Sequence, residues 1–246
     1  MEAEQVLCQT PGFQQIERWM LDKGWQIADF QYQTWIHVLK GYSGLVQAPT
    51  GCGKTFAVFL PVVAQWINRH SSTSACSGLQ LLWITPLRAL ANDLAHSMQQ
   101  ALYELGLPWK VGVRNGDTSP VMRQQQQKQM PEVLIITPES LHLLLTHAHH
   151  PDYFRSLMMM VVDEWHELLG SKRGLLVSLA CAYLQHLQTS VHHKHPTPIW
   201  ALSATLAHPE DAMEALWGNP PPAKKIFIRA HIRKAIRIET IYPDNI

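Results

Sequence analysis

The segment Ala48-Pro-Thr-Gly-Cys-Gly-Lys-Thr55 has the residue spacing of a loop that binds the phosphates of a nucleoside triphosphate. It follows a short apolar run, Gly44-Leu45-Val46, and precedes an apolar pattern with helical spacing over residues 56–67. A strand, a glycine-containing loop and a helix in this order surround a phosphate with backbone N–H groups and the positive end of the helix dipole. The first position departs from the usual pattern, because Ala48 replaces glycine. We predict a phosphate-binding loop here and not a turn that merely contains Lys-Thr.

The loop also contains side chains suited to both the phosphates and a magnesium ion. Lys54 can reach the β and γ phosphates, and the Thr55 hydroxyl can coordinate Mg²⁺. The predicted nucleotide-binding residues of the loop are Thr50, Gly51, Cys52, Gly53, Lys54 and Thr55.

The composition restricts the classes of protein that are possible. A length of 246 residues suffices for one large α/β domain or two small ones. The formal net charge is only +1, so any nucleic-acid site must be local. The four cysteines form no C-x-x-C pair, which favours free thiols in a reducing compartment. The acidic, polar start, Met1-Glu2-Ala3-Glu4-Gln5, is not typical of a secretory signal, and no apolar run approaches the roughly 20 residues of a membrane span. We expect a soluble, cytoplasmic protein that does not contact membranes.

Short apolar runs alternate with longer patterns of helical spacing, as in a buried parallel sheet built from βαβ units. The predicted strands are residues 44–47, 79–85, 109–114, 133–137, 157–163 and 199–203. The predicted helices between and after them are residues 56–68, 87–105, 120–130, 138–147, 174–187 and 209–217. Two further helices, 14–23 and 31–39, precede the first strand, and one or two strands, 224–229 and 235–242, close the chain. The sequence predicts a doubly wound α/β fold with a mostly parallel sheet, whose ligands bind at the carboxyl ends of the strands.

Two carboxylates follow the strand that ends at Val162. In the segment Asp163-Glu164-Trp165-His166, the first carboxylate can hold the Mg²⁺ that Thr55 also touches. The second can orient and deprotonate the attacking water. Such a pair can also simply cap a helix N-terminus. The phosphate loop upstream favours catalysis, with Lys54, Asp163 and Glu164 as catalytic residues.

A series of short segments in chain order resembles the motifs of superfamily 2 helicases. The segments are Phe30-Gln31, residues 48–55, Thr85-Pro86-Leu87-Arg88-Ala89-Leu90, Asn115-Gly116-Asp117-Thr118, Thr137-Pro138-Glu139-Ser140, residues 163–166 and Leu202-Ser203-Ala204-Thr205. The stretch 162–174 further resembles the Lhr-type DExH helicases and, among them, the bacterial ligase-associated branch. The resemblance implies a RecA-like domain that uses ATP and Mg²⁺.

The resemblance also implies roles for residues around the phosphate loop. Gln31 would read the adenine edge, and one of the aromatic residues Phe13, Trp19 and Trp25 would stack on the base. His166 would be a catalytic residue that links the metal site to Ser203 and Thr205, which would couple ATP to DNA. Each role has a plain alternative, since Gln31 could be an exposed polar residue and Ser203 and Thr205 could simply end a strand.

Five further residues would contact the phosphates of a single DNA strand by the same resemblance. They are Thr85, Arg88, Arg114, Gly116 and Thr137. Thr85 and Thr137 each precede a proline after a strand, so both could simply cap the following helix, a position that is itself a phosphate site. Arg88 could be a solvated surface charge.

The resemblance finally implies a domain organisation and partners. Residues 1–42 would form a helical segment with the adenine-recognition motif, 43–230 the RecA-like ATP-binding domain, and 231–246 a closing strand and linker. The second RecA-like domain and the C-terminal domains of a longer protein would be partners, together with single-stranded DNA, a DNA ligase and a nuclease. We expect the first motor domain of a DNA-repair helicase, nearly inactive alone. An RNA helicase domain and a catalytically silent, nucleotide-dependent interaction module are the alternatives.

Overall fold

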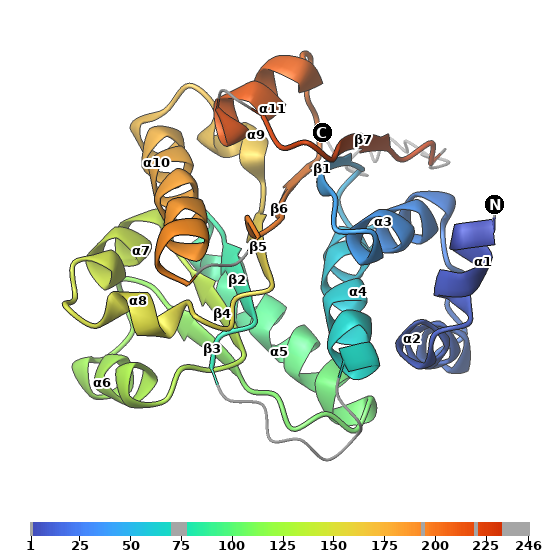
Figure 1. Cartoon of the computed structure of the whole chain (residues 1–246), viewed down its shortest axis with the longest axis horizontal. Coiled ribbons are helices and arrows are strands. Elements are labelled where there is room, and N and C mark those ends of the chain that lie inside the picture. Colours follow the sequence, from blue (N-terminus) through green and yellow to red (C-terminus); the bar gives the residue numbers. More distant parts are fainter. Residues whose placement is uncertain (1, 70–77, 193–194, 219–220, 233–246) are drawn as a thin grey trace, which may run out of the picture.

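The computed structural model describes residues 2–69, 78–192, 195–218 and 221–232 (Figure 1). Their strands form one seven-stranded sheet in the order β3-β4-β2-β5-β6-β1-β7, and every neighbouring pair is parallel. The strands are β1 (Ser43–Gln47), β2 (Leu81–Ile84), β3 (Val111–Arg114), β4 (Val133–Ile136), β5 (Met159–Val162), β6 (Ile199–Ser203) and β7 (Lys225–Arg229). The predicted doubly wound α/β fold with a parallel sheet is confirmed.

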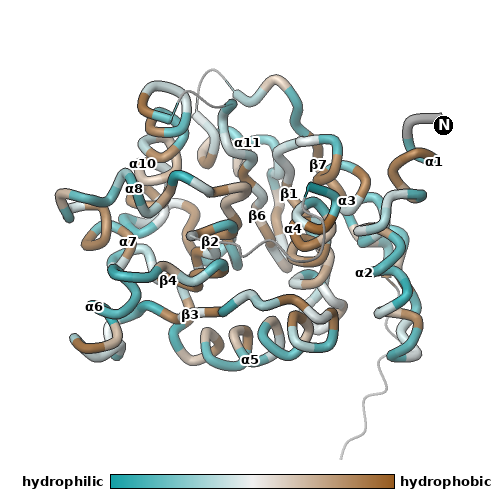
Figure 2. Tube along the Cα trace, turned by 60° about the horizontal axis from the view of Figure 1, so that its bottom comes forward, coloured by the Kyte–Doolittle hydropathy of each residue, from teal (hydrophilic) through white to brown (hydrophobic). Residues whose placement is uncertain are grey.

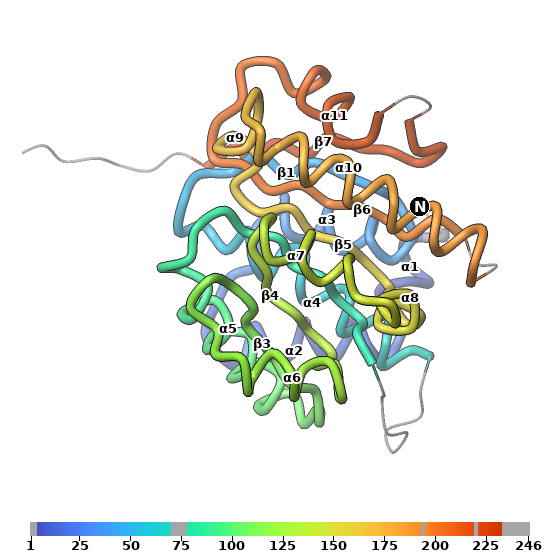
Figure 3. The backbone as a smooth tube through the Cα atoms, turned by 90° about the vertical axis from the view of Figure 1, so that its left-hand side faces the viewer, coloured from blue at the N-terminus to red at the C-terminus, as the bar shows by residue number. Residues whose placement is uncertain are grey.

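Helices cover both faces of the sheet (Figures 1 and 3). The helices are α1 (Glu2–Cys8), α2 (Pro11–Asp22), α3 (Asp29–Leu39), α4 (Lys54–Arg69), α5 (Arg88–Glu104), α6 (Pro120–Lys128), α7 (Pro138–Leu145), α8 (His150–Tyr153), α9 (Trp165–Leu168), α10 (Lys172–His186) and α11 (Pro209–Trp217). A π-helical segment, η1 (Leu187–Val191), continues α10.

The two faces bury separate hydrophobic cores, which explains why the strands read as continuous apolar runs. In β2, Leu81 and Trp83 join one core with α2, α3, α4 and α5. Leu82 and Ile84 of the same strand join the other core with α7, α10 and α11. Alternate side chains of a strand point to opposite faces, and here both faces are dry.

Helix α6 differs from the others because it lies at the edge of the sheet beside β3. Gln126 is its single buried residue, and most of the helix is hydrophilic (Figure 2). The side-chain amide of Gln126 donates a hydrogen bond to the carbonyl of Val113 in β3 (3.0 Å).

The predicted elements that fall on the described residues all occur, and their shifted ends matter for the site. The predicted helix 56–68 begins two residues earlier, so Lys54 and Thr55 lie in the first turn of α4, where backbone N–H groups lack helical partners. The predicted strands 79–85, 133–137 and 157–163 each end one residue earlier, so Thr85, Thr137 and Asp163 lie just past the sheet.

Four short segments, α1, α8, α9 and η1, were not predicted. The first three have only two turns or fewer, too short to show a helical period. The predicted strand 235–242 and most of the predicted linker 231–246 lie outside the described residues. The division at residue 42 stays a prediction, although Phe13 and Ile16 of α2 share a core with Val58 and Leu60 of α4. Within the part of the chain that the structure describes, no helix is long and apolar enough to cross a bilayer.

Candidate active site

The sequence-predicted site residues gather at the carboxyl edge of the sheet because the strands there are in register. The backbone N–H of Asp163 donates to the carbonyl of Ile84 (2.8 Å), and that of Thr85 donates to the carbonyl of Ile136 (3.0 Å). The backbone N–H of Ala48 donates to the carbonyl of Ser203 (3.0 Å). The edge therefore has two halves. Strands β1, β6 and β5 lead into the phosphate loop, Ser203 and Asp163, and strands β2, β4 and β3 lead into the residues predicted to contact DNA.

The phosphate loop has a backbone that favours glycine at two positions. Gly51 has φ +71° and Gly53 has φ +85°, both in the left-handed region. A Cβ atom on Gly53 would also lie 2.6 Å from Nε2 of Gln31. The Cys52 thiol turns back to the carbonyl of Pro49 (2.7 Å). These contacts within and around the loop fix its conformation.

Gln31 contacts this loop directly and is almost fully buried. Its Oε1 accepts a hydrogen bond from the backbone N–H of Ala28 (3.0 Å), and its Nε2 donates to the carbonyl of Gly53 (3.1 Å). Gln31 is therefore not an exposed polar residue. Its role in reading adenine stays a prediction.

The structure distinguishes among the three aromatic residues predicted as a base platform. Phe13 is fully buried, between the rings of Tyr32 and Trp35. Trp19 is 8% exposed, and its indole N–H donates to Glu104 (2.8 Å). Trp25 is 43% exposed and stacks on Phe56, the residue after Thr55 (ring centroids 5.8 Å apart). Only Trp25 of the three combines an accessible ring with a position beside the loop.

Lys54 faces Glu164 across the site. The Lys54 Nζ atom lies 3.5 Å from Oε1 of Glu164, and both side chains are largely buried. Among the described residues, neither Lys54 Nζ nor Glu164 Oε2 makes a hydrogen bond. Glu164 also has φ 45°, the one left-handed non-glycine residue in the described chain. Buried polar atoms without partners and local backbone strain both concentrate where proteins bind substrates.

Asp163 is a buried carboxylate held by two donors. The backbone N–H of Glu164 donates to Oδ1 (2.9 Å), and Trp83 Nε1 donates to Oδ2 (3.3 Å). Burial and, second, the charge of Glu164 raise the pKa of Asp163 to about 6, against the lowering effect of both donors. Asp163 offers carboxylate oxygens just past β5, and Thr55 offers a hydroxyl in the first turn of α4. Oxygen donors of these kinds suit Mg²⁺.

Asp163→Asn is expected to stabilise the metal-free protein at pH 7.5. The folded-state pKa exceeds the ordinary value of 3.8, so ionised Asp163 destabilises the fold above pH about 6. The cost is at most about 3 kcal/mol for a shift of about two pKa units. It should vanish as the pH falls from about 6 toward 4, where both the folded and unfolded states are protonated. Urea denaturation of both proteins across this range checks the prediction, and a stability difference independent of pH would contradict it.

His166 and Ser203 extend the carboxylate cluster toward β6. The Ser203 hydroxyl donates to the carbonyl of Thr205 (3.0 Å) and lies 3.1 Å from Nδ1 of His166. Because the hydroxyl has one proton, Nδ1 of His166 must be the donor in that second contact. The same Nδ1 lies 3.4 Å from Oε2 of Glu164. The structure therefore connects Glu164, His166 and Ser203, whereas the side chain of Thr205 is exposed.

Thr85 and Thr137 are buried at the ends of β2 and β4. The Thr85 hydroxyl accepts from the backbone N–H of Leu87 (3.4 Å), and the Thr137 hydroxyl donates to that of Ser140 (3.0 Å). Thr137 occupies the N-cap position of α7, but its side chain makes no capping hydrogen bond to the helix backbone. Neither threonine is a simple helix cap.

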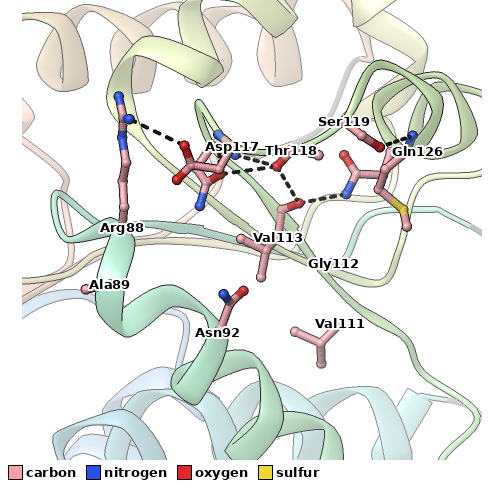
Figure 4. A pocket seen from close by; sticks show the side chains of 12 residues that line it. Arg88, Ala89, Asn92, Val111, Gly112, Val113, Asp117, Thr118, Ser119 and Gln126 are labelled. Atoms are coloured by element: carbon pink, nitrogen blue, oxygen red, sulfur yellow. Dashed lines mark hydrogen bonds and ion pairs between the residues drawn. The ribbon is translucent and has the colours of Figure 1, made fainter.

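Arg88 lines a hollow of about 820 Å³ between α5, β3 and α6 (Figure 4). Arg114 is the last residue of β3, and Gly116 follows it by two positions. Arg88 is exposed and lies 3.9 Å from Asp117. A Cβ on Gly116 would lie 2.8 Å from the Arg88 guanidinium, so glycine leaves room for that side chain. Arg114 is buried, and it donates to the carbonyl of Arg123 (3.3 Å). Burial lowers the pKa of Arg114.

Sequence reasoning missed two arginines in this half of the edge. Arg123 of α6 donates to the carbonyls of Asn115 (3.0 Å) and Gly116 (3.2 Å) and so fixes the loop after β3. Arg173 of α10 bonds Glu139 and Pro86. The run Ser171-Lys172-Arg173-Gly174 was a signal for Arg173, but nothing in the sequence named its partners.

Comparisons with known proteins agree with this geometry. The family model described as DEAD/DEAH box helicase matches residues 28–213. The "Lhr helicase/ probable uracil glycosylase" of Mycolicibacterium smegmatis is 36% identical over 213 residues, which are 80% of this chain and 14% of the relative. An "ATP-dependent helicase Lhr-Core" of Saccharolobus solfataricus is 32% identical, over 84% of this chain and 24% of the relative.

A solved structure of Mycobacterium smegmatis helicase Lhr bound to ssDNA and AMP-PNP has the same fold. It superposes with a TM-score of 0.68 at 33% identity, over 83% of this chain and 26% of that chain. The present chain thus spans roughly a quarter or less of the length of these relatives. The chain belongs to the DEAD/DEAH box helicase family, and its homologues among the Lhr-type helicases identify it with their first RecA-like domain region.

Proposed function

We propose that this chain is the first motor domain of an ATP-dependent helicase or translocase that moves along single-stranded DNA. The observation that carries the proposal is the pair of buried atoms beside the phosphate loop, Lys54 Nζ and Glu164 Oε2, that make no hydrogen bond among the described residues. A cation and a carboxylate left without hydrogen bonds in a partly buried site are costly. Phosphate oxygens for Lys54 and a water molecule for Glu164 would supply the missing partners.

Mg²⁺ would be held by the Thr55 hydroxyl and the Asp163 carboxylate. When bound, it neutralises charge that develops on the transferred phosphate. Lys54 would exchange its contact with Glu164 for the β and γ phosphates. Glu164 would then be free to orient the attacking water and accept its proton. His166 contacts both Glu164 and Ser203, so a movement of Glu164 would be transmitted through His166 to Ser203 in β6.

Single-stranded DNA would contact the edge formed by β2, β4 and β3. Thr137 is the N-cap residue of α7, Thr85 lies three residues before the start of α5, and helix N-termini attract phosphate. The similar Mycobacterium smegmatis structure contains ssDNA and AMP-PNP, which supports DNA over RNA. The competing RNA helicase function makes the opposite prediction in a salt-matched competition between DNA and RNA strands.

The cellular setting is also proposed from the resemblance. We infer a DNA-repair enzyme in the cytoplasm that works with a DNA ligase and a nuclease, and whose further domains complete the motor. A silent, nucleotide-dependent interaction module would share the nucleotide site but show no ATP turnover in any longer form of the protein.

Lys54→Ala is expected to weaken the affinity for Mg-ATP by at least about 2 kcal/mol, roughly 30-fold in Kd, because a charge-assisted contact is lost. Isothermal titration with a nonhydrolysable ATP analogue measures this change. Lys128→Ala is the matched control, since Lys128 is exposed on α6 at the other end of the sheet. Wild-type affinity for Lys54→Ala would refute the assignment of the site.

A further inference from the structure

A single arginine joins two of the loops in the DNA-facing half of the edge. Arg173 Nε donates to Glu139 Oε1 (2.6 Å), and its Nη2 donates to Glu139 Oε2 (3.4 Å). The same Nη2 donates to the carbonyl of Pro86 (3.2 Å). Glu139 follows Thr137 by two residues, and Pro86 directly follows Thr85. A guanidinium can serve both partners because its planar fork presents several fixed N–H groups.

The residues around Arg173 fix its position relative to the DExH segment. Helix α9 begins at Trp165, one residue after Glu164, and ends at Leu168. The Leu168 carbonyl accepts from the Ser171 hydroxyl (2.6 Å), which in turn accepts from the backbone N–H of Gly174 (3.1 Å). A Cβ on Gly174 would lie 2.1 Å from the Leu168 oxygen, so only glycine permits this approach. Ser171 and Gly174 thus dock the start of α10 on the end of α9.

We propose that Arg173 is a positioning residue that holds the loops after β2 and β4 in the arrangement that grips a nucleic-acid strand, and that α9 connects it to Glu164. The inference rests on the proposed function. It explains three residues of the run Ser171-Lys172-Arg173-Gly174. Ser171 caps α10, Gly174 permits the close contact between α10 and α9, and Arg173, between them in sequence, contacts the two loops. Arg173 also connects the two halves of the edge, whereas the contact between His166 and Ser203 stays within the half that contains the phosphate loop.

A purely structural role does not explain the arrangement. The side chains of Arg173 and Glu139 are 40% and 44% exposed, and ion pairs at such exposure contribute little to stability. Helices α7 and α10 are also joined separately, by His142 Nε2 and the carbonyl of Leu176 (2.8 Å). The two helices lie side by side in Figures 1 and 3. Breaking the Arg173 contacts should therefore change the loops and not the fold.

The test measures the affinity of the full-length protein for a labelled oligothymidylate, with a nonhydrolysable ATP analogue and Mg²⁺, at several salt concentrations. Arg173→Ala should weaken DNA binding by about tenfold, within the usual range for coupled sites. Arg173→Lys should be intermediate, because an ammonium group cannot reproduce the fork. The affinity for the ATP analogue without DNA and the melting temperature should stay near wild type. Lys172→Ala is the matched control, since it removes the same charge one position away from an exposed side chain.

Glu139→Gln decides between positioning and direct charge contact. It removes a negative charge, so electrostatics alone predict tighter DNA binding. The positioning role predicts weaker binding, and a double variant with Arg173→Ala no weaker than Arg173→Ala alone. Tighter or unchanged binding by Glu139→Gln, or wild-type binding by Arg173→Ala, would overturn this inference alone. A wild-type protein without affinity for the oligonucleotide would overturn the proposed function and this inference with it.

Discussion

Glu164→Gln is expected to leave the affinity for ATP near wild type and to lower ATP turnover by about 10²–10⁴-fold, the usual range for a positioned general base. The structure supports this separation, because Glu164 contacts Lys54 and His166 and makes no hydrogen bond through Oε2 among the described residues. Glutamine keeps the size and one oxygen but cannot accept the proton of the attacking water. Turnover is measured in a form of the protein that contains both motor domains.

Glu167→Gln is the matched control for this experiment. Glu167 lies on α9, its side chain is 58% exposed, and it approaches the other ring nitrogen of His166 (3.5 Å). Its substitution should leave turnover within a few fold of wild type. A fall in turnover of Glu164→Gln that only follows a fall in ATP affinity would make Glu164 a structural residue.

The sequence was sufficient for the sheet and for the half of the edge near the phosphate loop. Strands such as β2 are buried on both faces, so each is an apolar run that needs no periodicity to be recognised. The segments 48–55 and 163–166 each follow such a strand directly, and parallel strands bring their carboxyl ends to one edge. The local motifs and the parallel topology therefore predict the same edge for both segments. This is why the sequence alone predicts that Lys54 and Glu164 lie close together.

The remaining features depend on contacts between distant parts of the chain. Trp83 donates to Asp163 across 80 positions, and Arg173 reaches Pro86 across 87. Neither contact leaves a periodic signal. The exposure of individual side chains could not be predicted from the sequence either. Phe13 and Trp25 are both aromatic residues in or near α2, but of the two only Trp25 is accessible to a ligand. Arg114, which the resemblance placed beside a DNA strand, is buried against Arg123.

Residues 1–246 alone are expected to bind ATP or ADP but to hydrolyse ATP barely above background, with little stimulation by DNA and no unwinding. The phosphate loop, the proposed Mg²⁺ ligands and Glu164, the residue proposed to orient the water, are present, so nucleotide binding should persist. In this class of reaction an arginine supplied from outside the loop accelerates phosphoryl transfer by about 10³–10⁵-fold. By resemblance, the second RecA-like domain would supply it.

Three arginines of the described chain that could be considered for this role each contact another polar residue. Arg88 lies near Asp117, Arg173 bonds Glu139, and Arg229 donates to Gln47 (3.0 Å). The chain would also offer only one side of a groove for DNA, so its DNA affinity should be weak and fall steeply with salt, because phosphate contacts dominate such binding.

Steady-state hydrolysis by residues 1–246, with and without single-stranded DNA, compared with a longer form that contains the second motor domain, checks this expectation. Lys54→Ala in the same short form serves as the background, since it lacks the phosphate contact but keeps the fold. A rate for the wild-type short form close to that of Lys54→Ala, together with intact nucleotide binding, is the expected result. Strong DNA-stimulated hydrolysis by residues 1–246 would instead mean that the chain completes its own transition-state site.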